Sequence, residues 1–134
     1  MIRPMTNRKQ ISGLIFVVAS LCILIISCLS GSKIPSGAAS FASMDLITHF
    51  LMYGFLSHAF YRFLKDLFYP HHIGSISLIL VVLVPFVYGV VLELLQNFVP
   101  GRQSSLEDAL SNLMGSCLSL ILIVLWRKLR TRQE

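Results

Sequence analysis

The sequence predicts an all-α membrane protein in which four transmembrane helices form a compact bundle. The first observation is composition: the 134-residue chain is 55% hydrophobic and 13% charged, with a mean hydropathy of +0.77. Soluble domains carry about 25% charged residues, so this composition favours a protein that lies in lipid. The second observation is four apolar runs, each close to the roughly 20 residues that a membrane helix needs. The third is the clustering of Lys and Arg beside those runs, which is typical of membrane orientation signals.

The predicted helices follow from these uncharged runs and from the residues that interrupt them. The first run has no charge from residue 11 to 32, and the third helix begins near Ser75, after a segment that contains Pro70 and Gly74. The connecting segments GSKIPSG, YPHHIG and VPGRQSS are rich in turn-forming Gly, Pro and Ser. We therefore expect helices at residues 11–30, 46–64, 75–98 and 105–126.

The length predicts a single domain over residues 1–134, with short basic cytoplasmic tails at 1–10 and 127–134. If the N-terminus is inside the cell, nine of the eleven Lys and Arg residues lie on the inner side. Lys33 and Arg102 then lie outside, so the positive-inside rule predicts an N-in, C-in topology. Because these basic clusters border apolar runs, they account for the net charge of +5, and we expect no nucleic-acid partner.

The first helix has a second interpretation. Its basic start and the apolar run that ends Ile-Ile-Ser-Cys28 resemble a signal peptide, in one form that of a lipoprotein. The run is long for a signal, and the other three helices are predicted either way. Cys22, Cys28 and Cys117 all lie in apolar runs, so we interpret them as small buried residues rather than as a disulfide set.

Polar side chains gather in the outer half of this predicted topology. On the second helix, Asp45, His49 and Tyr53 are spaced i, i+4 and i+8 and share one face. Ionisable residues inside a membrane usually face the bundle interior or a wet cavity, because exposing them to lipid costs free energy. We expect these residues to line one cavity between three helices and the outer loop. The other polar residues expected to line it are Glu93, Gln96, Arg102, Asp108 and Asn112.

Several of these residues also have purely structural interpretations. Ser104 and Glu107 fit a capping box with Ser104 as the N-cap of the fourth helix, and Asp108 suits the positive end of the helix dipole. Asp45 could cap the second helix in the same way. The convergence of all the polar residues favours a shared site.

Interior packing supplies the other structural interpretations. Glu93 and Gln96 could form an interhelical hydrogen bond, and His49 could be a satisfied interfacial histidine. Small residues at Ser111, Gly115 and Ser119 form a stripe on the fourth helix, which predicts close packing against a neighbouring helix.

Two motifs resemble the VanZ-like family of bacterial membrane proteins. They are DLITHFLMYGFL, from Asp45, and ELLQNFVPGRQSSLEDALSNLMG, from Glu93, and the resemblance covers roughly residues 10 to 126. The family often has a lysine after the aspartate, where this chain has Leu46, which leaves Arg102 as the main positive group. The resemblance implies a multi-pass protein of the bacterial inner membrane and a link to resistance against the glycopeptide teicoplanin. The resemblance also groups the chain with proteins proposed to process lipid head groups.

Two functional hypotheses follow, and the sequence does not decide whether the protein is an enzyme. In the first, the cavity acts on a lipid or lipid-linked head group, with His49, Glu93 and Asp108 as catalytic candidates. The binding residues would then be Asp45, Tyr53, Gln96, Arg102 and Asn112. In the second, the same cavity holds a membrane lipid, a cell-wall precursor, a glycopeptide or a partner without catalysis, and homo-oligomers fit either case. A transporter ranks third. As a variant of the first hypothesis, Asp108 could complete a metal site with His49 and Glu93. Because no short paired-ligand motif is present, we expect no metal site, and we expect no cofactor.

Overall fold

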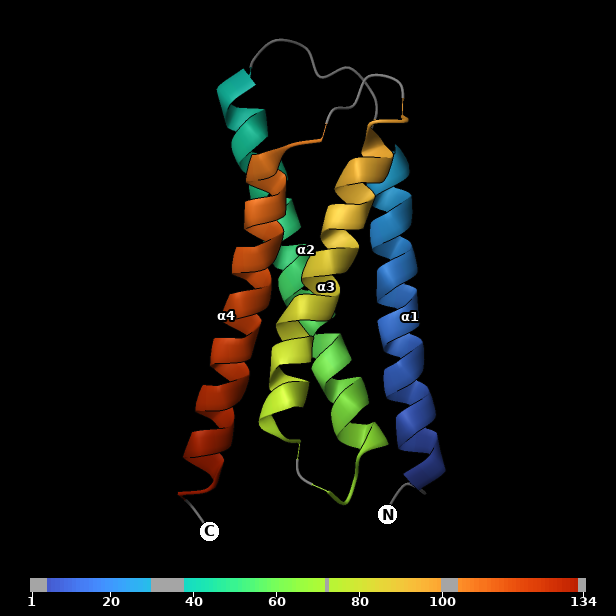
Figure 1. The fold of residues 1–134 in the computed structure, drawn as a ribbon, viewed down its shortest axis with the longest axis vertical. Helices are drawn as coiled ribbons and strands as arrows, with labels where there is room; N and C mark the ends of the chain where they lie inside the picture. Colours follow the sequence, from blue (N-terminus) through green and yellow to red (C-terminus); the bar gives the residue numbers. More distant parts are fainter. Residues whose placement is uncertain (1–4, 30–37, 72, 100–103, 133–134) are drawn as a thin grey trace.

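Four helices build the computed structural model, which describes residues 5–29, 38–71, 73–99 and 104–132. They are α1 (Met5–Leu29), α2 (Ala38–Leu67), α3 (Ser75–Gln96) and α4 (Leu106–Arg130). Figure 1 shows the helices running side by side, with both ends of the chain at the same end of the bundle. The predicted all-α bundle is confirmed, whereas the side of the membrane on which the termini lie stays a prediction.

The helix boundaries correct the predicted ones mainly at the polar ends. α1 begins at Met5 instead of residue 11, α2 at Ala38 instead of 46, and α4 ends at Arg130 instead of 126. Counting an apolar run finds the part of a helix that lipid covers, but a helix continues beyond it where good helix formers follow. One consequence is that Asp45 lies well inside α2, so the proposed capping role of Asp45 is wrong.

α2 is the central helix, and it packs against each of the other three. The described parts of α1, α3 and α4 are long and apolar enough to cross a membrane, and α2 is not among these three spans. Its more polar side chains are covered by its neighbours, as His49, Tyr53 and Ser57 show, with at most 3% of each exposed. Burial inside the bundle therefore explains how a helix of this composition is accommodated.

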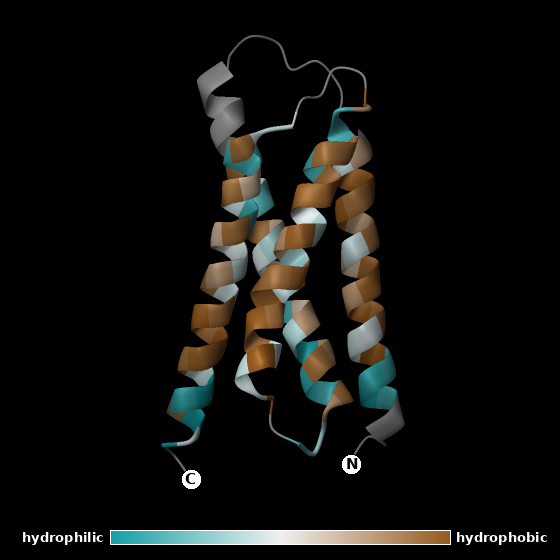
Figure 2. Ribbon diagram, viewed as in Figure 1, coloured by the Kyte–Doolittle hydropathy of each residue, from teal (hydrophilic) through white to brown (hydrophobic). Residues whose placement is uncertain are grey.

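Large apolar side chains cover the outside of the bundle, and polar residues gather at its ends (Figure 2). This distribution suits a multi-pass membrane protein, in which the outer surface faces acyl chains. Cys22, Cys28 and Cys117 are free thiols on that outer surface. The expectation that they are buried is wrong, although the absence of a disulfide among them agrees with the prediction.

Glycines set the spacing between α2 and α4. A Cβ atom added at Gly115 would collide with the carbonyl oxygen of Phe50, and one added at Gly54 would lie 3.2 Å from the Gly115 carbonyl oxygen. Ser111, beside this contact, donates a hydrogen bond to the Leu46 carbonyl at 2.6 Å. The predicted small-residue stripe on α4 is thus confirmed as a close-packing face, and it draws the first turns of α4 towards His49 on α2.

Candidate functional site

The candidate site is a group of polar side chains on α2, α3 and α4, towards the end of the bundle away from the chain termini. At its centre, His49 is 3% exposed, and its Nδ1 atom lies 3.0 Å from the Oδ1 atom of Asn112. Because an amide oxygen only accepts hydrogen bonds, this contact places the proton of the neutral imidazole on Nδ1. The lone pair of Nε2 then points away from Asn112.

Carboxylates lie near both ring nitrogens of His49. Glu93 of α3, itself 4% exposed, places Oε1 3.7 Å from Nδ1. Asp45, one turn earlier on α2, places Oδ1 3.9 Å from Nε2. Two carboxylate groups therefore lie at opposite edges of one buried imidazole ring.

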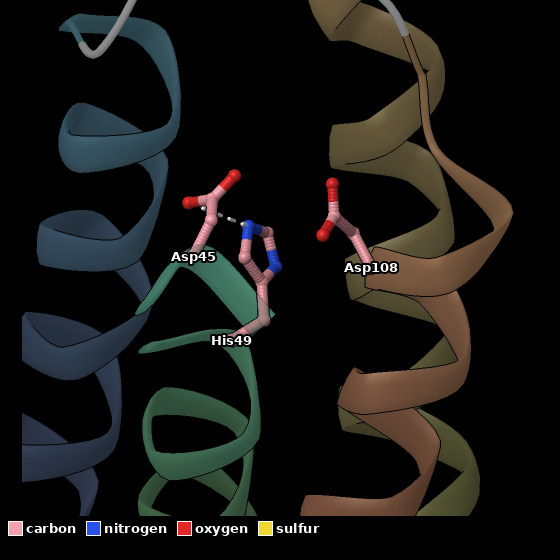
Figure 3. Close-up of side chains that lie close together, drawn as sticks. All are labelled: Asp45, His49 and Asp108. Carbon is pink, nitrogen blue, oxygen red and sulfur yellow. Dashed lines mark ion pairs between the residues drawn. The ribbon is translucent and has the colours of Figure 1, made fainter. Parts of the chain in front are cut away.

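Asp108 of α4 faces the same ring from across it, so that in Figure 3 the imidazole lies between Asp45 and Asp108. One ligand atom each from Asp45, His49 and Asp108 lies within 4.8 Å of the other two. Three protein ligands of this kind are the number found at many catalytic zinc sites. This group could therefore hold a divalent cation. It differs from the metal alternative considered from sequence, which combined Asp108 with His49 and Glu93.

The more exposed edge of the site is on the Asp45 side. The Asp45 side chain keeps 45% of its surface exposed, whereas His49, Glu93 and Asn112 are buried. Nε2 of His49 therefore faces the more open edge, and Nδ1 faces the bundle interior. A head group that approaches along this edge would meet Nε2 first.

The start of α4 is fixed by side chains of α3. Glu93 Oε2 accepts a hydrogen bond from the Ser105 backbone N–H at 3.4 Å, and Asn97 Oδ1 accepts one from the Ser104 N–H at 2.9 Å. Ser105 caps the helix, and its hydroxyl accepts from the Asp108 N–H at 3.4 Å. The predicted capping role of Ser104 is wrong by one residue, because Ser105 is the residue with extended backbone before the first helical turn.

Two buried amides in this region keep donors that have no hydrogen-bond partner in the described structure. They are Asn112 Nδ2 and Gln96 Nε2, in residues that are 0% and 3% exposed. A buried donor without a partner costs about 1–3 kcal/mol, so each such group needs an explanation, for example a water molecule, an ion or a ligand. Both amides were predicted as binding residues, and their free donors are consistent with that role.

Tyr53 and Gly89 form the deep wall behind Asn112. The Tyr53 side chain is 1% exposed, and its ring is parallel to that of His49 with centroids 6.3 Å apart. A Cβ atom on Gly89 would lie 2.8 Å from both Asn112 Nδ2 and Tyr53 Cε1. Gly89 is a site residue that sequence reasoning missed; the one available signal was a glycine inside an apolar helix, which often marks a close approach.

Seven of the eight predicted site residues belong to this region of the described structure, and the eighth, Arg102, lies outside the described residues. The helix spacing of Asp45, His49 and Tyr53 is confirmed by their shared face. Whether any of these residues binds or catalyses stays a prediction.

Comparisons with known proteins identify a family but no individual relative. The sequence model of a family described as VanZ/LLP1 matches residues 9–127. No curated protein and no solved structure matches the chain significantly.

Proposed function

The chain belongs to the VanZ/LLP1 family, and on that premise we propose that it is a membrane enzyme acting on the head group of a lipid or lipid-linked precursor. One observation carries the proposal: a buried histidine has carboxylate oxygens 3.7 Å and 3.9 Å from its two ring nitrogens. Buried ionisable groups at membrane depth are costly to maintain and usually functional. Their position near one end of the bundle suits a substrate whose polar part lies at the membrane surface.

In this proposal His49 acts as a general base through Nε2. Asn112 holds the proton on Nδ1, so Nε2 can take a proton from a water molecule or hydroxyl that attacks the head group. The bond from the attacked atom to the leaving oxygen then breaks, and the imidazolium gives the proton to that oxygen. Glu93 and Asp45 then stabilise the imidazolium ion that forms, from the interior and from the open edge respectively. Gln96 and Asn112 are buried behind this edge, and in the proposal Asn112 acts on the substrate through His49, whose ring it orients.

Charge limits the substrates that fit. The described cluster holds three carboxylates, Asp45, Glu93 and Asp108, which repel an anionic phosphate group. An anionic head group therefore needs a cation beside it, either Arg102 or a divalent metal. A metal held by Asp45, His49 and Asp108 would occupy Nε2, so in that case His49 is a ligand and not the general base. A head group with an amino group needs neither, since the carboxylates attract it directly. The proposal thus predicts divalent-cation or Arg102 dependence for phosphate substrates and none for amines.

The test is turnover of a panel of head-group-labelled lipids by the purified protein in detergent, with and without EDTA. Replacing His49 by Ala should lower the rate by roughly a hundredfold or more, the usual contribution of a general base. His71→Ala is the matched control, because His71 is an exposed histidine in the connection between α2 and α3. Equal rates for His49→Ala and the unmodified protein, or no turnover of any lipid, would reject the enzyme.

Glu93→Gln separates this proposal from a non-catalytic protein that binds a head group, cell-wall precursor or partner. The amide keeps an oxygen that can accept the Ser105 N–H but loses the charge opposite His49. An enzyme that depends on the imidazolium ion should lose most of its rate, whereas a binding protein should keep its affinity within about threefold. Retained function in this variant would favour the binding protein.

We further infer that the protein lies in the inner bacterial membrane. We also infer that it affects susceptibility to glycopeptide or lipopeptide antibiotics, as family membership suggests. Deletion of the gene should change the inhibitory concentration of teicoplanin or of a lipopeptide at least twofold, and the intact gene should restore it. The His49→Ala gene should fail to restore it if the phenotype depends on the site. An unchanged inhibitory concentration after deletion would reject the inferred effect on antibiotic susceptibility. It would not bear on the proposed enzymatic activity.

A further inference from the structure

A basic groove lies at the opposite end of the molecule from the His49 cluster, where the chain termini lie. It has a volume of about 890 Å³ and is formed mainly by α1 and α2, with one residue of α4. Its cationic side chains are Arg8, Arg62, Lys65 and Arg130, against one carboxylate, Asp66. All four cations are exposed, and none is in an ion pair with a carboxylate within the described residues. The groove therefore carries uncompensated positive charge.

This groove continues directly into an apolar one. A second cavity of about 460 Å³ runs along the seam between α1 and α2, and it shares Ile15 and Phe55 with the basic groove. Its lining is apolar from Leu14 to Ile26 of α1. From Ile11 to Ile26, α1 rises about 22 Å at 1.5 Å per residue. That exceeds half of the roughly 30 Å hydrocarbon core, so the seam is long enough to hold one acyl chain.

We propose that this continuous groove binds an anionic glycerophospholipid, with its phosphate among Arg8, Arg62, Lys65 and Arg130 and an acyl chain along the seam of α1 and α2. Guanidinium groups form paired, charge-assisted hydrogen bonds with phosphate, and the apolar seam excludes a phosphate without a hydrocarbon tail as the full ligand. The proposal is independent of the proposed activity, because the two sites lie at opposite ends of α2.

The order of charged and apolar residues matches the order of groups in such a lipid. The cations lie at the chain-terminal end, where Figure 2 shows hydrophilic residues on α1, α2 and α4. Farther along α1, Val18 near the middle of the helix and Ile26 near its other end expose 48% and 46% of their surface beside the seam. A membrane surface that attracts basic residues in general would act on every cation at this end, whereas a bound lipid depends on the cations in the groove.

The experiment measures lipid retained by the purified protein in detergent, using native mass spectrometry with phosphatidylglycerol and phosphatidylcholine as probes. We expect preferential retention of phosphatidylglycerol. Arg62→Ala should weaken its binding about fivefold, the contribution of one cation near an anionic surface. Lys128→Ala is the matched control, since Lys128 is an exposed cation near the same end but lines neither groove. Equal losses of phosphatidylglycerol binding in the two variants would overturn the proposed site. They would mean that the lipid is attracted by every cation at this end of the protein.

A second pair of variants tests the acyl part. Val18→Trp fills the seam, whereas Val17→Trp adds the same ring at a neighbouring position, also about half exposed, that does not line it. We expect Val18→Trp alone to lower retention of phosphatidylglycerol, and excess glycerol phosphate to compete poorly. Equal retention of the two lipids, equal effects of the two Trp variants, or full competition by glycerol phosphate would each overturn the proposal. A folded state is checked for each variant by its helical circular dichroism.

Discussion

His49 on α2 and Asn112 on α4 form a buried contact in which Nδ1 of the ring lies 3.0 Å from the amide oxygen. Glu93 Oε1 lies 3.7 Å from the same nitrogen, beyond hydrogen-bond distance but on the same side of the ring. The Asn112 oxygen accepts from a proton on Nδ1, and the negative charge of Glu93 on that side also attracts such a proton. The contact therefore decides which nitrogen is presented to the open edge of the site.

The first prediction concerns this tautomer. Nitrogen NMR of ¹⁵N-histidine-labelled protein should show neutral His49 with its proton on Nδ1, the signal being assigned by its loss in His49→Gln. Replacing both side chains, in Glu93→Leu with Asn112→Leu, should shift the population towards the proton on Nε2, where Asp45 is the remaining acceptor. A ring that is protonated mainly on Nε2 in the unmodified protein would contradict the assigned geometry.

The second prediction concerns the close contact of α2 and α4. Gly115→Ala places a methyl group against the Phe50 carbonyl, and backbone cannot move aside as a flexible side chain does. We expect a loss of about 1–3 kcal/mol in stability, as for other overpacked sites, seen as a lower thermal midpoint in detergent. Gly74→Ala is the control, because nothing lies within 4 Å of an added Cβ there. Equal midpoints for the two variants would show that the helices can separate without cost.

Much of the fold was predictable because lipid imposes simple rules. Uncharged runs located all four helices, and the spacing of Asp45, His49 and Tyr53 placed them on one face of α2. Helix ends were predicted less well, since the helix-forming residues before Asp45 and after Trp126 continue the helices beyond the apolar runs. The first eight residues of α2 were missed for that reason.

The geometry of the site was not predictable in the same way. Periodicity gives the face of a helix on which Glu93 lies, but not which nitrogen of His49 it approaches. That depends on how closely the helices pack, and hence on Gly89 and Gly115, whose importance rests on atoms of other helices. The cap of α4 fell on Ser105 instead of Ser104 because two adjacent serines offer the same side chain and only the backbone angles distinguish them.

The third prediction tests Gly89 as the support of the site. In Gly89→Ala the new methyl group meets Asn112 Nδ2 and Tyr53 Cε1, both at 2.8 Å. Removing the Asn112 side chain relieves one of these collisions. Asn112→Ala should therefore cost less stability in the Gly89→Ala protein than in the unmodified protein, with a coupling of at least about 0.5 kcal/mol.

The control for this coupling is Gly13→Ala on α1, where an added Cβ meets only the Phe63 ring, at 3.3–3.4 Å. Its effect should add to that of Asn112→Ala, because the two positions share no partner. Thermal midpoints of the four proteins in each cycle, measured in one detergent, give both couplings. Additive effects for Gly89 and Asn112 would mean that the deep wall rearranges freely and does not hold the His49 contact in place.

The fourth prediction concerns the serine that begins α4. Ser105→Ala removes the acceptor of the Asp108 N–H and should destabilise the protein by about 1 kcal/mol, the usual cost of a lost N-cap. Ser104→Ala keeps the backbone N–H that bonds to Asn97, so it should change stability by less than about 0.5 kcal/mol. Because Asp108 faces His49 from the first turn of α4, Ser105→Ala should also reduce the activity of the site more than Ser104→Ala does. The reverse order, in thermal midpoint or in activity, would return the cap to Ser104 and move the start of α4 by one residue.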